Sequence, residues 1–273
     1  MKQFDSPVEQ HYFQEGIFEH IIQLLKETGK EKVNREDITI VDEFHVRGGE
    51  VSLELAAEAG FDKDTKVLDV GCGIGGPCRM IAARYGCKVT GLDLTEEFIR
   101  TAKLLSRETG LEDLTDFVQG NALNLPFENE SFDVVWTQHV QMNIEEKKGF
   151  YSEIKRVLKK GGKFIYYDIF SKNHEPLHFP VPWAMDQSLS FLITINELDH
   201  LLNSLGFTKV KTKDQTPEAV SFFKDLMERN AKEDPPKVGI FVLMGKSTSE
   251  KLSGLVRNIK ENKLELQSGI YSS

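Results

Sequence analysis

The feature that most constrains the fold is a run of glycines placed directly after a short apolar segment. Residues 66–70 read Lys-Val-Leu-Asp-Val, and glycines follow at positions 71, 73, 75 and 76. A short, continuous apolar run of this kind is typical of a buried parallel strand. Glycines at its end permit a tight turn whose backbone can come close to a ligand. The sequence therefore predicts a strand, a ligand-binding turn and a helix that begins near Pro77, where a proline is tolerated.

The same alternation of apolar runs and amphipathic segments continues along the chain. We expect further strands at residues 88–93, 116–119, 132–136, 163–170, 208–213 and 238–245. Strands that alternate with helices form a parallel sheet covered by helices on both faces. The prediction is an α/β fold with a seven-stranded, mostly parallel sheet.

The remaining segments are expected to decorate this sheet. Residues 1–62 have helical spacing and form a cap, residues 63–170 form the core that binds the ligand, and residues 171–273 complete the domain. Within this last part, we interpret the proline-rich stretch 171–193 as a lid, 215–236 as a helical insertion and 251–266 as a final helix. No linker-like stretch interrupts the chain, so residues 1–273 are interpreted as one domain.

Charge and cysteine content exclude several classes of partner. The formal net charge is −9 and no strongly basic run is present, which argues against nucleic acid as a partner. There is neither an apolar run of membrane-spanning length nor a signal peptide pattern. The three cysteines match no zinc-binding spacing and suit a reducing compartment. We expect a cytoplasmic protein with no metal and no membrane partner, and a homodimer is left open.

Two acidic residues narrow the choice of ligand. Gly71, Gly73 and Gly76 satisfy the dinucleotide-binding pattern, so the turn alone also fits an NAD(P)-dependent oxidoreductase. Asp93 ends the second strand, where an acid can bind ribose hydroxyls in either case. Asp69 separates the alternatives, because a carboxylate there suits an ammonium and a sulfonium but would repel a pyrophosphate. A methyl-donor cofactor is favoured.

Five motifs in order resemble those of class I S-adenosylmethionine-dependent methyltransferases. Residues 67–76 resemble motif I of that family, and residues 91–93, 120–127, 131–135 and 156–162 are similar to its later motifs. A weaker likeness, over residues 44–49 and the insertion before the expected seventh strand, points to the sarcosine/dimethylglycine N-methyltransferase branch. The resemblance implies a Rossmann-like fold and S-adenosyl-L-methionine as the cofactor.

The resemblance also implies positions for the cofactor. Its methionine part would be held by the glycine turn, its ribose by an acid, and its adenine by the loop after the third strand. The corresponding cofactor-binding residues are Asp69, Gly71, Cys72, Gly73, Asp93, Leu94, Asn121, Ala122 and Gln138. Asn121 stands where the family often has aspartate, and its side-chain carbonyl would still accept a hydrogen bond from the adenine amino group.

Candidate acceptor-side residues lie in three segments. Ligands of such sheets bind beyond the carboxyl ends of the strands, so the loop 137–143 opens onto the site. His139 there is a candidate general base or, about equally, a residue that shapes the pocket. In the cap, Arg47 beside His45 could hold a substrate carboxylate or could be an ordinary surface arginine. In the lid, His178 and Trp183 could surround a cationic amine or simply form a small core.

The sequence thus predicts methyl transfer to a small molecule by in-line displacement, with an amine or amino-acid-like acceptor preferred. A quinone or phenol acceptor is the alternative within this class. Two alternatives lie outside the methyltransferases: an NAD(P)-dependent oxidoreductase and a non-catalytic cofactor-binding module.

Overall fold

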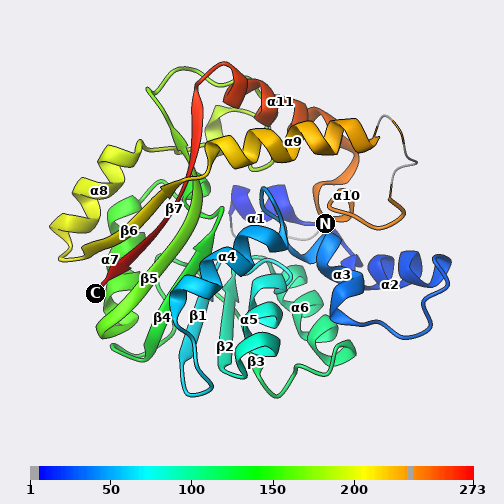
Figure 1. The fold of residues 1–273 in the computed structure, drawn as a ribbon, viewed down its shortest axis with the longest axis horizontal. Coiled ribbons are helices and arrows are strands. Elements are labelled where there is room, and N and C mark those ends of the chain that lie inside the picture. The colour runs from blue at the N-terminus through cyan, green and yellow to red at the C-terminus, as the bar shows by residue number, and fades with distance from the viewer. Residues whose placement is uncertain (1–5, 231, 233–235) are drawn as a thin grey trace.

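The computed structural model describes residues 6–230, 232 and 236–273, and a seven-stranded sheet lies at its centre (Figure 1). The strands are ordered β3-β2-β1-β4-β5-β7-β6. Strands β1 to β5 are parallel, whereas β7 runs antiparallel to its neighbours β5 and β6. The strands are β1 Lys66–Val70, β2 Lys88–Asp93, β3 Thr115–Gln119, β4 Phe132–Gln138, β5 Leu158–Ser171, β6 Thr208–Asp214 and β7 Leu264–Ser272. The predicted seven-stranded, mostly parallel sheet is confirmed.

Helices cover both faces of the sheet because successive strand residues point to opposite sides. Leu68 and Phe164 pack on one face with α7 (Lys147–Val157) and α8 (Ile195–Ser204). Val67 and Trp136 pack on the other face with side chains of five further helices. These helices are α4 Gly49–Ala59, α5 Gly76–Tyr85, α6 Glu96–Glu108, α9 Thr216–Asn230 and α11 Thr248–Lys260.

The described part of the N-terminal cap consists of helices joined by short loops and has a core of its own. It contains α1 (Pro7–Tyr12), α2 (Ile17–Glu27) and α3 (Arg35–Asp42), followed by α4. Ile21 and Ile38 of the cap pack with Phe98 of α6 and Val242 of the short helix α10. The cap is therefore attached both to the sheet layer and to the C-terminal third of the chain.

The C-terminal third departs from the predicted elements. Residues 238–245 are not a strand, since they contain α10 (Phe241–Met244), and the seventh strand is β7. The predicted helix 251–266 is wrong at its end, because α11 stops at Lys260. The expected helical insertion 215–236 is confirmed over α9, while positions 231 and 233–235 lie outside the described residues.

Strand β7 lacks the continuous apolar pattern of a buried strand, because its buried polar residues have hydrogen-bond partners. Gln267 and Ser268 lie in its middle and are nevertheless buried. The Tyr166 hydroxyl donates to Gln267 Oε1, and Gln215 Nε2 donates to Ser268 Oγ at 3.0 Å. The apolar residues of α10 pack elsewhere: Val242 and Leu243 belong to the core of the cap.

Two smaller features complete the arrangement around the sheet edge. Strand β5 begins at Leu158, before the Lys-Lys-Gly-Gly turn at 159–162, rather than after it as expected. The lid stretch 171–193 is largely irregular and carries one 3₁₀ turn, Gln187–Leu189.

Within the described ranges, no helix combines the length and the apolar character that crossing a bilayer requires.

Candidate functional site

The glycine turn between β1 and α5 opens toward solvent at one position. Gly71, Gly73 and Gly75 all have positive φ, which favours glycine. A Cβ placed on Gly73 would meet no atom within 4 Å, whereas one on Gly71 would lie 2.4 Å from Val140 Cγ2. The turn therefore leaves an open cradle above Gly73 and is closed on its other side by the loop after β4.

Most N–H groups of this turn are already used inside the protein. The N–H groups of Gly71 and Cys72 donate to the Leu92 carbonyl at 2.7 and 3.0 Å. The N–H of Gly73 donates to Asp93 Oδ2 at 2.9 Å. The N–H groups of these three residues are therefore satisfied within the protein, and a ligand can occupy the open space above Gly73.

The two acids of the predicted cofactor site differ in their partners. Asp69 is buried at the end of β1 and accepts a hydrogen bond from Cys78 Sγ at 3.3 Å. Burial, with a smaller contribution from Asp93, raises the pKa of Asp69 to about 7. Asp93 accepts from the N–H groups of Gly73 and Thr95, and burial raises the pKa of Asp93 as well. Asp69 has no cationic partner in the described residues, which suits a cationic ligand.

These residues line one cavity of about 1670 Å³ at the carboxyl ends of the strands. The cavity brings together every cofactor-binding position predicted from the sequence: Asp69, Gly71, Cys72, Gly73, Asp93, Leu94, Asn121, Ala122 and Gln138. Of the predicted acceptor-side residues, it includes His45, His139 and Trp183. Their roles toward a cofactor or an acceptor stay predictions.

Asn121 is held differently from the expectation for an adenine contact. Its Oδ1 accepts the N–H of Leu123 at 2.9 Å, which folds the loop after β3. A carbonyl oxygen has a second lone pair, and the Nδ2 group of Asn121 is a donor. The residue can therefore still contact an adenine edge while it holds the loop.

A polar wall from the cap and β4 faces the cavity. Ser52 Oγ lies 2.9 Å from Glu43 Oε2, 3.0 Å from His45 Nε2 and 3.2 Å from Gln138 Oε1. Trp136 Nε1 donates to Gln138 Oε1 at 2.9 Å and so fixes that amide. His45 Nε2 also lies 2.9 Å from the Gly48 carbonyl oxygen, which requires a proton on this nitrogen. Burial lowers the pKa of His45 to about 4, so this histidine is neutral.

His139 lies in the same wall, and its buried Nε2 lacks a hydrogen-bond partner among the described residues. Its backbone has a φ of 53°, an unusual value for a residue with a side chain. Burial, and to a lesser degree His45, holds the pKa of His139 well below its usual value. His139 is therefore a neutral group that can share a hydrogen bond with a ligand, and it is a weaker base than its position alone indicates.

Arg47 does not reach the cavity, so the expectation that it binds a substrate carboxylate is corrected. Its Nη1 donates to Gln215 Oε1 at 2.8 Å, and its Nη2 lies 3.3 Å from Glu50 Oε1. A second ion pair links Arg47 to Glu54. The hydrogen bonds and ion pairs of the guanidinium thus join α4 to the segment before α9.

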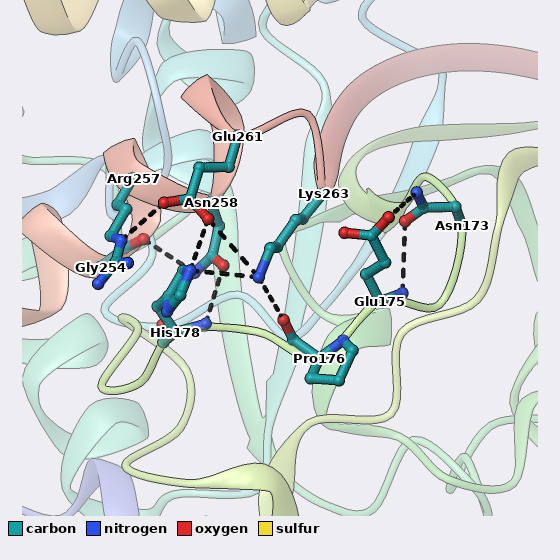
Figure 2. A network of polar contacts seen from close by, with 9 residues as sticks. All are labelled: Asn173, Glu175, Pro176, His178, Gly254, Arg257, Asn258, Glu261 and Lys263. Atoms are coloured by element: carbon teal, nitrogen blue, oxygen red, sulfur yellow. Dashed lines mark hydrogen bonds and ion pairs between the residues drawn. The ribbon is translucent and has the colours of Figure 1, made fainter.

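His178 also lies away from the cavity, and its expected contact with an acceptor is corrected. Figure 2 shows it in a polar network where the lid meets the end of α11. His178 Nε2 lies 2.6 Å from Glu261 Oε2, and its backbone N–H donates to Asn258 Oδ1 at 2.9 Å. Lys263 Nζ donates to the Pro176 carbonyl at 2.8 Å. The network attaches the lid to α11.

The structure adds residues that sequence reasoning did not identify. Tyr12 of α1 lines the cavity, and its hydroxyl donates to Asn143 Oδ1 at 2.8 Å. Asn143 Nδ2 in turn donates to the carbonyls of Trp183 and Leu189 in the lid, both at 2.9 Å. Glu43 and apolar side chains of α9, α10 and α11 also line the cavity. No local motif marks these residues, because tertiary packing alone brings them to the sheet edge.

In the parts of the chain that the structure describes, no group of three or more histidine, cysteine, aspartate or glutamate side chains could hold a metal ion.

Comparisons with known proteins show what a part of the chain resembles. The family model described as "Methyltransferase domain" matches residues 68–166. The chain is 42% identical over 167 residues to a sterol 24-C-methyltransferase of Saccharomyces cerevisiae, covering 59% of this chain and 43% of that protein. It is 31% identical over 153 residues to the sarcosine/dimethylglycine N-methyltransferase of Halorhodospira halochloris, covering 56% and 55%. The chain thus spans less than two thirds of the length of these relatives.

A solved structure extends the likeness over the whole fold. Geranyl diphosphate C-methyltransferase from Streptomyces coelicolor A3(2) superposes with a TM-score of 0.69 over 99% of both chains, at 14% identity. Such a low identity shows a shared fold. The chain thus matches the methyltransferase-domain model over residues 68–166 and shares its overall fold with that methyltransferase.

Proposed function

We propose that the chain transfers a methyl group from S-adenosyl-L-methionine to an apolar, lipid-like small molecule. The proposal rests most on one observation: the cavity that adjoins the cofactor cradle is large and has an apolar wall. That wall is contributed by α9, α10 and α11 and includes Phe222, Phe223, Leu226, Val242, Leu252 and Val256.

The residues present fit the cofactor. The open cradle above Gly73 lets a ligand come close to the backbone. Asp69 supplies a carboxyl without a cationic partner for a positively charged group of the ligand. Asp93 lies at the end of β2, where a ribose would be bound. When bound, S-adenosyl-L-methionine supplies an electrophilic methyl group on a positively charged sulfur. The task of the chain is then to orient the acceptor and to exclude water, an effect that can be worth roughly 7–11 kcal/mol.

The lid and the N-terminal helix are placed to exclude water. The bonds from Tyr12 to Asn143 and from Asn143 to Trp183 and Leu189 join α1, the loop after β4 and the lid over one side of the cavity. Trp183 is itself fully buried, and its Nε1 donates to Ser190 Oγ at 3.0 Å. These contacts support a closed reaction chamber rather than an open surface site.

The charges around the cavity do not favour an amino-acid-like acceptor. Its carboxylate would need a fixed cation, but Arg47 is paired with acids elsewhere. Among the described residues, the Arg and Lys side chains that line the cavity are Arg229 and Lys246, and both are exposed. An acceptor without a carboxylate, inserted against the apolar wall, fits these residues better. The sterol methyltransferase relatives are consistent with such an acceptor.

A two-step experiment tests the proposal. Calorimetry first measures binding of S-adenosyl-L-methionine and of NADH to the purified chain. We expect binding of the first only, and NADH binding instead would favour the oxidoreductase alternative. The chain is then incubated with labelled methyl donor and a panel that contains sterols, isoprenoid alkenes, sarcosine, phosphoethanolamine and simple phenols. Methylation of an apolar compound, read by mass spectrometry, is the expected result.

The outcomes of the panel separate the acceptor classes. Methylation of sarcosine or phosphoethanolamine alone would refute the apolar acceptor and support an amine. A methylated phenol would support the quinone or phenol class. Tight cofactor binding with no product, even from a lipid extract of cells, would support a non-catalytic module.

A further inference from the structure

The Glu43 side chain lies in the cavity wall and has no assigned function in cofactor or acceptor binding. Glu43 follows directly after α3, and its side chain is only 1% exposed although it lines the cavity. Its Oε2 accepts a hydrogen bond from Ser52 Oγ at 2.9 Å. Its Oε1 has no hydrogen-bond partner among the described residues. A buried carboxyl oxygen without a partner is costly unless a ligand or a proton satisfies it.

The neighbouring charges leave Glu43 uncompensated. The buried Arg79 is already paired with the neighbouring Asp42, since its Nη2 lies 2.8 Å from Asp42 Oδ2. Arg35 of the same helix acts on Glu43 only as a weaker, more distant positive charge. His45 Nε2 lies 3.5 Å from Glu43 Oε2, but this histidine is neutral. No cation is therefore dedicated to Glu43 in the described part of the chain.

The residue before Glu43 packs on the start of α5, and Glu43 itself lines the same cavity as the glycine turn. A Cβ on Gly76, at the start of α5, would lie 2.1 Å from the Asp42 backbone carbonyl oxygen. The end of α3 is thus packed directly on the glycine turn. Glu43 connects through Ser52 to Gln138, the last residue of β4, which lines the same cavity.

We propose that Glu43 Oε1 accepts the proton that the acceptor loses when it is methylated. The proposal rests on the methyltransferase function proposed above and holds for any acceptor that must lose a proton. The acceptor forms a new bond to the methyl carbon, the old carbon–sulfur bond breaks with its electron pair kept by sulfur, and the proton leaves the acceptor for Glu43. Atoms and charge balance without a further reactant.

The electrostatics of the cavity support this assignment. Burial, with the nearby Asp42, raises the pKa of Glu43 to about 8, so the neutral form predominates at pH 7 in the empty cavity. A positive charge brought into the cavity favours the carboxylate and drives the proton out. Once that positive charge is gone, the cavity again favours the protonated form. Glu43 is thus a carboxylate before the transfer and an acid after it.

Proton release on ligand binding tests the proposal without an acceptor. Calorimetric titrations with S-adenosylmethionine and S-adenosylhomocysteine, each in two buffers of different ionisation enthalpy at pH 7, measure the protons released. The response of Asp69 to the ammonium, which both ligands carry, cancels between them, whereas its response to the sulfonium remains in the difference. We expect the sulfonium ligand to release up to about one proton more than the thioether. The E43Q variant should remove most of this difference and leave only the part that Asp69 contributes.

Controls keep the outcomes distinct. The S52A variant retains the carboxyl and should retain the difference, and the E43D variant covers the case in which E43Q does not fold. An equal proton release from both ligands in the wild-type chain, or an unchanged difference in E43Q, would overturn the assignment. Absence of any S-adenosylmethionine binding would instead overturn the proposed function.

A kinetic arm follows once an acceptor is known. E43Q should lower kcat by about 10²- to 10⁴-fold, as is typical for loss of a general base. The KM for the acceptor should change far less. A kcat within twofold of the wild type would contradict the assignment.

Discussion

The buried pair of Arg79 and Asp42 should be a principal link between the N-terminal cap and the cofactor-binding core. Arg79 belongs to α5, next to the glycine turn, and is fully buried. Besides Asp42, it donates to the Ile74 carbonyl at 2.7 Å and to the Ala102 carbonyl at 3.2 Å. We predict that the substitution R79M will strongly destabilise the fold, because it leaves the Asp42 carboxylate buried without its partner.

The expected size follows from the burial of both groups. Breaking a buried ion pair by removing one partner typically costs about 3–5 kcal/mol, because an uncompensated charge remains. For a chain of this size, 1 kcal/mol corresponds to a shift in Tm of about 2–4 °C, so R79M should lower Tm by roughly 6–20 °C. The double substitution D42N/R79M removes the stranded charge. It should recover about 0.5–3 kcal/mol relative to the sum of the single changes.

Urea unfolding of the wild type, both single variants and the double variant gives the coupling energy. The far-UV and tryptophan signals should report the same order of stability. If R79M loses less than about 1 kcal/mol, or if the double variant loses as much as the two single variants together, the pair does not hold the cap in the way described.

Three further predictions concern the residues around the cavity. G71A should weaken S-adenosylmethionine binding at least tenfold in calorimetry, because a Cβ would lie 2.4 Å from Val140 Cγ2 and φ is +78°; unchanged affinity would contradict the geometry of the turn. D69N should raise the Tm of the ligand-free chain at pH 8, because a carboxyl with a folded pKa raised to about 7 is destabilising once pH rises above its unfolded pKa. The gain should vanish below about pH 4, where Asp69 is protonated in both states, and a gain that persists there would refute the cause. R47A should lower the free energy of unfolding by about 1–3 kcal/mol and leave the acceptor KM unchanged, since Arg47 holds Gln215 outside the cavity; a large rise in KM would contradict this placement.

The part of the fold that could be predicted from sequence is the part where local pattern and tertiary position agree. The apolar run at 66–70 is buried between two parallel neighbours, so its composition reports its position directly. The glycine turn likewise requires its positive φ values wherever the chain places it. The cofactor positions around it follow, since parallel strands end at one edge of the sheet.

The failures arise where tertiary partners replace local pattern. The β7 residues Gln267 and Ser268 are polar, and only their bonds to Tyr166 and Gln215 make burial possible. The apolar run at 238–245 carries no signal that separates a strand in a sheet from a short helix under the cap. Arg47 could not be assigned from sequence for a related reason, because its partners on α4 and before α9 are distant in the chain or face it only after folding.

The position of β7 between β5 and β6 has a consequence for biosynthesis. In Figure 1 the yellow strand β6 reaches the sheet only through the red strand β7, its single neighbour in the strand order. During translation, β6 leaves the ribosome well before β7 and must wait without a pairing partner, for several seconds at about 5–20 residues per second. Its sequence Thr-Lys-Val-Lys-Thr-Lys-Asp places lysines at every second position and most of its side chains stay exposed after folding. Charged lysines discourage an unpaired edge from joining another chain. The composition that makes β6 a soluble edge in the finished protein therefore also protects the nascent chain while the sheet is incomplete.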